Sequence, residues 1–154
     1  MNRAKCFFAV TLPCLLAFAQ APPSTQAVAL VQQALTFAKQ NGMAKLIEET
    51  NAPNGRFHVP KGDKLYIFIY DQRGLTKASG YRTETVASKN RGDRQDPDGV
   101  MIIQKLLRVA KNQERGWVDY KYPNPRTNLL DQKTTYYEFY ESMMIGCGIN
   151  KEAN

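Results

Sequence analysis

The chain has 154 residues, of which 43% are hydrophobic and 23% charged, with a formal net charge of +7. This length suits one globular domain, and the composition argues against disorder, a collagen-like repeat and a multi-span membrane protein. The basic residues are scattered along the chain and form no run. The positive charge therefore does not indicate a nucleic-acid partner.

The N-terminus has the three-part layout of a secretory signal peptide. Arg3 and Lys5 precede an apolar run over residues 6–18, and Ala19-Gln20-Ala21 follows with small residues at its outer positions. Thirteen apolar residues are too few to span a bilayer of about 30 Å as a helix. We expect cleavage after Ala21, so that residues 1–21 are a signal peptide and residues 22–154 form one exported domain, in the periplasm or secreted. The alternatives are an uncleaved anchor or a buried helix.

Helical periodicity is strongest near the start of the expected domain. Residues 26–40 place apolar side chains on one face, namely Leu30, Val31, Ala34, Leu35, Phe37 and Ala38. Asn41-Gly42 is a helix stop, and residues 43–50 read as a second short helix. Residues 21–25 read as a lead-in rich in Pro, Ser and Thr, and residues 51–63 as a loop.

The first predicted strand covers residues 65–70 and is apolar on both faces, which is typical of a central strand with cover on both sides. The turn Asp71-Gln72-Arg73-Gly74 leads into a short strand near residues 75–79. Residues 81–99 are polar and irregular, and Asp96 or Asp98 is a candidate cap for a helix over residues 100–111.

The C-terminal third predicts strands over residues 116–121, 131–140 and 143–149, with a Pro/Asn turn between the first two. The order of helix, strands, helix and strands indicates an α+β domain built on an antiparallel sheet. Without a second long apolar run, we expect no membrane anchor after signal cleavage.

Catalytic and metal sites have little support in the sequence. His58 is the only histidine, and Cys147 is the only cysteine beyond the predicted signal peptide. Cys147 stands between two glycines inside a predicted strand, so we expect a small packed residue rather than a nucleophile. Asp93, Asp96 and Asp98 lack the spacing of a twelve-residue calcium loop and suit a turn better. We therefore predict no enzyme, metal or cofactor.

Two carboxylates near the C-terminus also fail as an acid–base pair. Glu138 and Glu141 are three residues apart, which places them on opposite faces if both lie in one strand. We interpret both as solvated charges.

Tyrosines and one lysine on the predicted strands favour a small-ligand site. Tyrosine combines an apolar ring with a hydroxyl group, although ordinary sheet core explains any single one. Lys133 lies inside a strand-like segment, and an inward lysine needs a negative partner. A bound carboxylate is one such partner, and a surface position for Lys133 is the alternative.

Three stretches resemble the single-module form of the extracellular Cache sensor domain. They are residues 65–74 with the strand and its Asp-x-x-Gly turn; Asp96-Pro97-Asp98-Gly99 before a helix; and residues 116–148 with Gly116-Trp117-Val118-Asp119-Tyr120, Asn124-Pro125, Lys133, Tyr136 and Gly146-Cys147-Gly148. The resemblance covers roughly residues 27–151. It implies a long N-terminal helix packed on a PAS-like antiparallel sheet, with a ligand cavity on the other sheet face.

The resemblance also implies site residues, which we assign by position. The expected ligand-binding residues are Tyr66, Phe68, Trp117, Lys133 and Tyr136, with Ser79, Tyr81 and Arg82 from the loop as further candidates. Tyr66 and Trp117 would supply apolar walls, Lys133 or Arg82 would pair with a carboxylate, and Tyr136 would donate a hydrogen bond. Trp117 and Tyr136 equally suit structural positions in the sheet.

Cache domains usually bind small organic molecules, often short carboxylates or amino acids, between two membrane helices of a chemoreceptor or histidine kinase. Here a signal peptide stands in place of the first anchor. Two positions also depart from the family pattern: Ser79 where a histidine is common, and Ser88 where a glycine is expected. We therefore expect an exported sensor of a short organic acid without catalysis. The alternative is an interaction protein with a vestigial cavity that docks to a membrane receptor or histidine kinase.

Overall fold

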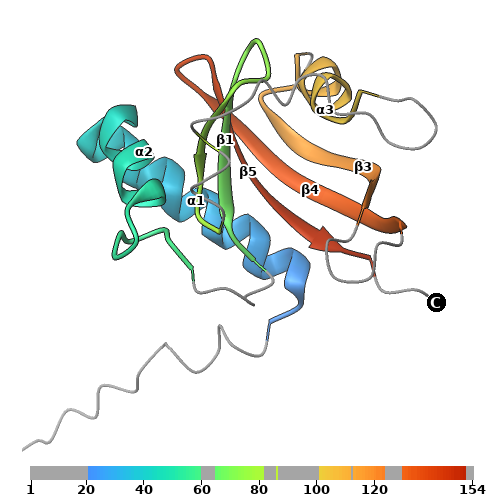
Figure 1. Cartoon of the computed structure of the whole chain (residues 1–154), viewed down its shortest axis with the longest axis horizontal. Helices are drawn as coiled ribbons and strands as arrows, with labels where there is room; N and C mark the ends of the chain where they lie inside the picture. The colour runs from blue at the N-terminus through green and yellow to red at the C-terminus, as the bar shows by residue number, and fades with distance from the viewer. Residues whose placement is uncertain are drawn as a thin grey trace, which may run out of the picture.

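A computed structural model describes residues 21–59, 65–81, 86, 101–111, 113–123 and 130–151. Its elements are α1 (Pro23–Asn41), α2 (Met43–Asn51), β1 (Ile67–Asp71), β2 (Thr76–Ser79), α3 (Ile102–Ala110), β3 (Arg115–Pro123), β4 (Leu130–Tyr140) and β5 (Met143–Asn150). The five strands form one antiparallel sheet in the order β2-β1-β5-β4-β3. The predicted α+β class and the inner position of β1 are confirmed (Figure 1).

Helix α1 begins at Pro23, so the expected lead-in over residues 21–25 is wrong for its last three residues. Proline fits the first turn of a helix because the missing N–H has no partner there in any case. The helix ends at Asn41, and Gly42 follows with a φ of 88°, a conformation that glycine adopts without strain. Helix α2 follows at once.

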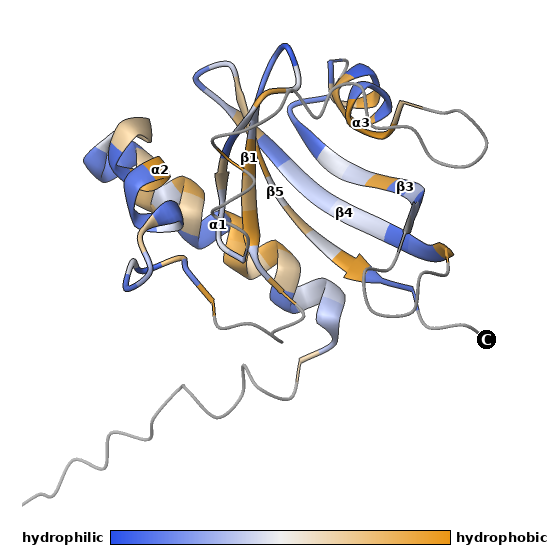
Figure 2. Cartoon of the chain, in the orientation of Figure 1, coloured by the Kyte–Doolittle hydropathy of each residue, from blue (hydrophilic) through white to orange (hydrophobic). Residues whose placement is uncertain are grey.

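Helices α1 and α2 cover one face of the sheet, here called the back face. The buried stripe of α1 consists of Ala27, Val31, Ala34 and Ala38, at spacings of three and four residues. These small side chains let the helix lie close to Ile67, Ile69, Ile145 and Cys147 of the inner strands. Figure 2 shows the apolar side of α1 turned toward the sheet. Burial of this interface supplies the main core of the domain.

The opposite face, here called the front face, has a second core beneath α3. Ile102, Ile103, Leu106, Leu107 and Ala110 of this helix are buried against sheet residues Phe68, Tyr70, Val118, Tyr137 and Met144. The inner strand β1 is therefore covered on both sides, as its two apolar faces predicted. Figure 1 places α3 at one end of the sheet, near the β1–β2 turn.

The edge strand β2 is tied to α2 by one side chain. The Asn51 side chain donates to the carbonyl of Lys77 at 3.0 Å and accepts from the backbone N–H of Ser79 at 3.1 Å. The turn before β2 is closed by Asp71, whose carboxylate accepts from the N–H groups of Arg73 and Leu75. These bonds fix the register of a strand only four residues long.

Candidate functional site

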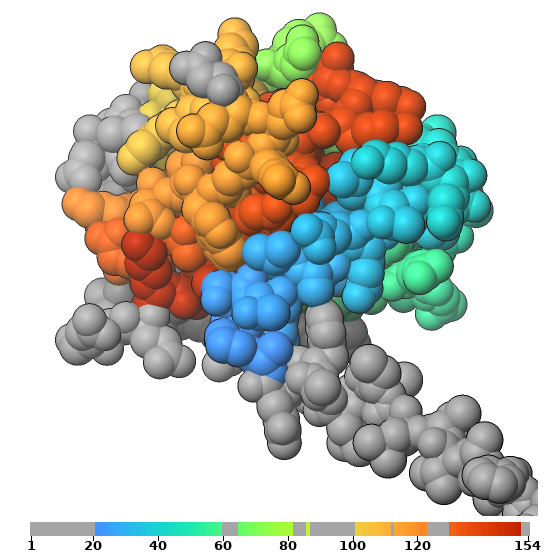
Figure 3. Space-filling model, turned by 180° about the vertical axis from the view of Figure 1, so that it is seen from behind, coloured from blue at the N-terminus to red at the C-terminus, as the bar shows by residue number. Residues whose placement is uncertain are grey.

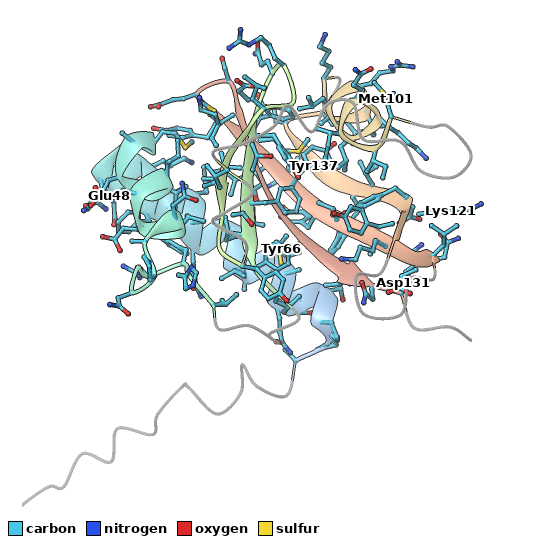
Figure 4. All side chains as sticks on the ribbon, viewed as in Figure 1. Glu48, Tyr66, Met101, Lys121, Asp131 and Tyr137 are labelled. Atoms are coloured by element: carbon cyan, nitrogen blue, oxygen red, sulfur yellow. The ribbon has the colours of Figure 1, made fainter. Side chains whose placement is uncertain are left out.

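The front face carries an unusual concentration of aromatic side chains. We call it the aromatic face, and its residues are Tyr66, Phe68, Tyr70, Val118, Tyr120, Tyr122, Lys133, Thr135, Tyr137, Phe139 and Met144. Every second residue of β1, β3 and β4 points to this side because side chains alternate along a strand. In Figure 4, Tyr66 and Tyr137 lie in front of the sheet, on the side away from α1. The face thus gathers residues from four strands.

The end of the aromatic face beneath α3 is dry and closely packed. Tyr137 and Met144 are fully buried there, and Phe68 is almost so. Gly146 lies directly under the Phe68 ring, and a Cβ atom at this position would be 2.6 Å from it. The Tyr137 hydroxyl is enclosed without a hydrogen-bond partner among the described residues. This end of the aromatic face is part of the hydrophobic core, and we do not assign a ligand to it.

The other end of the aromatic face is polar, half-buried and not covered by α3. Tyr120 and Lys133 are direct partners in the β3–β4 ladder, so their side chains lie next to each other. The Tyr120 hydroxyl lies 2.9 Å from Thr135 Oγ1, and the Lys133 ammonium lies 5.1 Å from the centre of the Tyr122 ring. This end combines hydroxyl groups, aromatic rings and one cation.

Gly148 on β5 forms the floor of this polar end. Gly148 pairs with Thr135, and a Cβ at Gly148 would be 3.0 Å from Thr135 Oγ1 and 3.5 Å from the Tyr120 hydroxyl. A side chain there would press against the hydroxyl pair. Because Gly148 has no side chain, the Tyr120 hydroxyl can pack close to the backbone of β5.

Lys133 is the electrostatic centre of the polar end. Burial lowers the pKa of Lys133 from its ordinary value of 10.5, because desolvation outweighs the attraction of Asp131 and Cys147. Within the described part of the chain, no carboxylate forms an ion pair with this ammonium. An anion brought to Lys133 would compensate the desolvated charge, whereas a cation would be repelled.

Tyr120, the ladder partner of Lys133, stays protonated at neutral pH. Burial raises the pKa of Tyr120 well above its ordinary value of 10, and the nearby phenols of Tyr66 and Tyr122 raise it further. Phenols held in the neutral form keep their O–H groups as hydrogen-bond donors. The polar end therefore offers an ammonium and neutral hydroxyl donors, a combination that suits a carboxylate.

The structure brings together five of the eight predicted site residues. Tyr66, Phe68 and Lys133 belong to the aromatic face, and Ser79 pairs with Phe68 and so shares that side. Tyr81 joins them through its ring, whose centroid lies 5.4 Å from that of Tyr66. Arg82 lies outside the described residues.

Trp117 and Tyr136 lie on the back face and are not brought together with the other candidates. They are partners in the β3–β4 ladder, with ring centroids 5.2 Å apart, and Tyr136 packs in the core under α1. Tyr136 is three residues from Lys133 on one strand, and an odd separation reverses the direction of a side chain. Strand alternation thus separates these two residues from the Lys133 side.

Tyr120, Tyr122 and Thr135 belong to the polar end but were absent from the predicted site. The same alternation points to them, since Thr135 is two residues from Lys133, and Tyr120 and Tyr122 are two residues apart. What the sequence did not provide was the register between β3 and β4, which places Tyr120 opposite Lys133. That register needs the paired structure.

Glu138 is buried, so its interpretation as a solvated charge is wrong. Its exposed fraction is 8%, and its carboxylate accepts a hydrogen bond of 2.8 Å from the Tyr136 hydroxyl. The residue is inside β4 on the back face, and Glu141 is in the turn that follows. Alternation had placed the two carboxylates apart, but cover from neighbouring side chains decided their exposure.

Cys147 is buried in the back-face core, as its position between two glycines predicted. Burial raises the pKa of the Cys147 thiol to about 12, which disfavours the reactive thiolate.

Among the described residues, no group of three or more His, Cys, Asp or Glu side chains is arranged to hold a metal ion. Asp93, Asp96 and Asp98 lie outside that part of the chain. No helix within it is long and apolar enough to cross a membrane.

Solved structures of similar fold include three from chemosensory or chemotaxis proteins. A domain described under "carboxylic acid recognition by a Cache chemosensory domain" shares 19% identity at a TM-score of 0.63, covering 84% of this chain and 93% of that one. A methyl-accepting chemotaxis protein from Vibrio parahaemolyticus shares 19% identity at a TM-score of 0.63. The match covers 90% of this chain and 93% of that one. A periplasmic sensor domain of a chemotaxis protein shares 18% identity at a TM-score of 0.61. The match covers 91% of this chain and 100% of that one.

No curated protein matches this chain in sequence. Residues 32–152, in contrast, match the family model of Single Cache domain 2. This span includes the second half of α1, and all of α2, the sheet and α3. With the fold and the sequence in agreement, the chain belongs to the Single Cache domain 2 family.

Proposed function

We propose that this protein is an exported sensor domain that binds a small carboxylate at the polar end of its aromatic face, without catalysis. Residues 1–21 act as a signal peptide, and residues 22–154 form the mature domain in the periplasm or outside the cell. The observation that carries the proposal is Lys133, a desolvated ammonium among aromatic rings and hydroxyl groups. The solved relative described for carboxylic acid recognition supports the same ligand class.

In the proposed complex, the Lys133 ammonium pairs with the carboxylate, and the neutral hydroxyls of Tyr120 and Thr135 lie next to that contact. Tyr66 and Tyr81 provide an aromatic wall for the apolar part of the ligand. The rings limit the space, which favours small organic acids. Binding would transmit ligand occupancy to a membrane receptor or histidine kinase as partner.

The test is a thermal-shift and calorimetric screen of the exported protein against small carboxylates, with amino acids, amines and nucleobases as other classes. A ligand that binds only the folded state stabilises it by about 2.7 kcal/mol at a hundredfold excess over its Kd. The sample is first denatured and its extract analysed by mass spectrometry, so that a ligand retained from purification is detected.

The decisive variant is Lys133→Met, because methionine removes the charge and nearly preserves the volume of the stem. We expect it to abolish the carboxylate response without loss of folding stability. Lys39→Ala is the matched control, since it removes one positive charge from the exposed side of α1 and should leave binding unchanged. A carboxylate response that survives in Lys133→Met would refute the assigned contact.

An absence of any response across the panel, with no retained ligand, would favour the interaction protein with a vestigial cavity. Two departures from the family pattern motivate this alternative: Ser79, where histidine is common, and Ser88, where glycine is expected. Capture of a receptor or kinase ectodomain by the exported protein would then be the positive evidence.

A further inference from the structure

A second chemical cluster lies on the back face, on the opposite side of the sheet from Lys133. Glu138 is flanked along β4 by Tyr136 and Tyr140, which point to the same side as Glu138 because each is two residues away. Trp117 on β3 packs on Tyr136 with ring centroids 5.2 Å apart. We call these four residues the Glu138 cluster. It places one carboxylate among three aromatic rings.

The carboxylate of Glu138 has one strong partner and one unfilled oxygen. The side chain is more than nine-tenths buried, and its Oε1 accepts from the Tyr136 hydroxyl at 2.8 Å. The other oxygen receives no hydrogen bond from the described residues, yet it is not among the enclosed side-chain atoms that lack a partner. It therefore keeps contact with solvent. A largely desolvated carboxylate with an open oxygen favours a positively charged partner.

The chain offers one nearby cation, but it does not occupy this position. Arg115 is the ladder partner of Glu138 across β3 and β4, and it is exposed. Burial raises the pKa of Tyr136, and the positive charge of Arg115 partly opposes this rise. No ion pair joins Arg115 to Glu138 among the described residues. Within the described part of the chain, Glu138 therefore has no cationic partner of its own.

The cluster reaches the protein surface through Trp117. This side chain is 40% exposed, an unusual state for the largest aromatic residue. Helix α1 packs on β5 and β4, and the view from behind shows the β3–β4 side of the sheet beyond it (Figure 3). Trp117 therefore stands at the border between solvent and the buried carboxylate.

We propose that the Glu138 cluster is a second binding site, specific for a small organic cation that carries a guanidinium or alkylammonium group. The carboxylate supplies the ion pair, and the partly exposed Trp117 ring supplies cation–π attraction. A neutral ligand of the same shape gains neither interaction. This site is separate from the Lys133 site in position and in the sign of its ligand, so either proposal stands if the other fails.

The test uses the fluorescence of Trp117, which is the only tryptophan in the chain. The exported protein is titrated with ethylguanidinium chloride at millimolar concentrations and constant ionic strength, and in parallel with N-ethylurea as a neutral analogue of similar shape. We expect a saturable change of Trp117 emission with ethylguanidinium alone. Equal responses to both compounds, or no saturable response to the cation, would overturn the proposal.

Two variants identify the groups responsible. Glu138→Gln keeps an acceptor for the Tyr136 hydroxyl and the same shape, and we expect it to weaken ethylguanidinium binding at least tenfold. Lys133→Met, on the opposite face, should leave this binding unchanged. Retained affinity in Glu138→Gln, or its loss in Lys133→Met, would contradict the assignment. Circular dichroism and Tm establish that each variant is folded.

Two further variants remain informative if Glu138→Gln fails to fold. Trp117→Leu keeps an apolar side chain against Tyr136, and calorimetry should show ethylguanidinium binding at least threefold weaker. Arg115→Gln removes the internal competitor and should retain or strengthen binding. Unchanged affinity in Trp117→Leu, or loss of binding in Arg115→Gln, would count against the site.

Discussion

Tyr120 and Lys133 are direct partners in the antiparallel β3–β4 ladder, and this pairing creates the polar end of the aromatic face. Neither residue comes from a loop, so both are held by strands that share main-chain hydrogen bonds. A phenol and an ammonium that project side by side from paired strands need little reorganisation on binding. The main uncompensated charge of this face, Lys133, therefore sits on a rigid support.

Binding of a carboxylate should weaken as the pH rises through the lowered pKa of Lys133. Ligand pairing favours charged Lys133, whereas burial lowers the pKa of this lysine in the free protein. Affinity is full below that lowered pKa and falls about tenfold per pH unit above it, until the pKa of the complex is reached. Calorimetric Kd values between pH 6 and 10 measure the effect.

The control for this pH dependence is Lys133→Arg, because guanidinium stays charged throughout the range. Where this variant binds the ligand, its affinity should be flat. The ligand-free protein should gain stability between the lowered pKa of Lys133 and 10.5, since the unfolded chain binds more protons there. A constant wild-type Kd up to pH 10 would contradict the role of Lys133.

Two hydroxyls of the front face, those of Tyr120 and Tyr137, should differ in what their removal does to stability. Tyr120→Phe loses the hydrogen bond to Thr135 and should cost about 0.5–1.5 kcal/mol. Tyr137→Phe removes an enclosed hydroxyl without a partner among the described residues, and it should be neutral or stabilising. Urea unfolding of the two variants makes the comparison, and a larger loss in Tyr137→Phe would contradict it.

The link between α2 and the edge strand should depend on Asn51. Asn51→Ala removes two hydrogen bonds to β2 and should lower the free energy of unfolding by about 1–3 kcal/mol. Asn41→Ala is a matched control, since that side chain makes a single exposed bond to the carbonyl of Phe37 and should cost less than about 1 kcal/mol. Equal losses in chemical denaturation would show that the two Asn51 bonds contribute no more than an exposed one.

Cys147 should be unreactive in the folded protein. Its thiol is enclosed in the core, and burial raises the pKa of Cys147 to about 12. Alkylation by iodoacetamide at pH 8 should be at least about a hundredfold slower in buffer than in denaturant, since it requires unfolding or local opening. Intact-mass measurement over time gives both rates. Prompt labelling of the native protein would show that the core around Cys147 opens readily.

The exported protein should begin at Pro22. Residues 1–21 have the charge, apolar run and small residues that signal peptidase requires. Intact mass and N-terminal sequencing of protein recovered from the periplasm or the culture medium check the site. A product that keeps Met1 and remains with the membrane would instead support an uncleaved anchor.

Local patterns determined much of the fold. The spacing of Ala27, Val31, Ala34 and Ala38 follows helical periodicity, and the two apolar faces of β1 indicated an inner strand. The turn at Asp71 follows from hydrogen bonds between residues close in the chain. Such features depend on short-range geometry, which a sequence contains in full.

The polar end of the aromatic face was only partly predictable. Lys133 and Tyr66 were identified because an ionisable or amphipathic side chain inside a strand is a local signal. Trp117 and Tyr136 were grouped with them, although the odd spacing of Tyr136 from Lys133 already indicated opposite faces. Alternation along one strand was therefore available in the sequence.

Only the tertiary structure decided which residues meet across strands and how deeply they are buried. The register that places Tyr120 opposite Lys133 is a property of the paired strands, and the residues of either strand alone do not specify it. The burial of Glu138 likewise depends on neighbours from other segments. Its burial could therefore not be predicted from its residue type and its place in the strand. Sequence determined the elements and the chemistry available to them, and packing between distant segments determined where that chemistry converges.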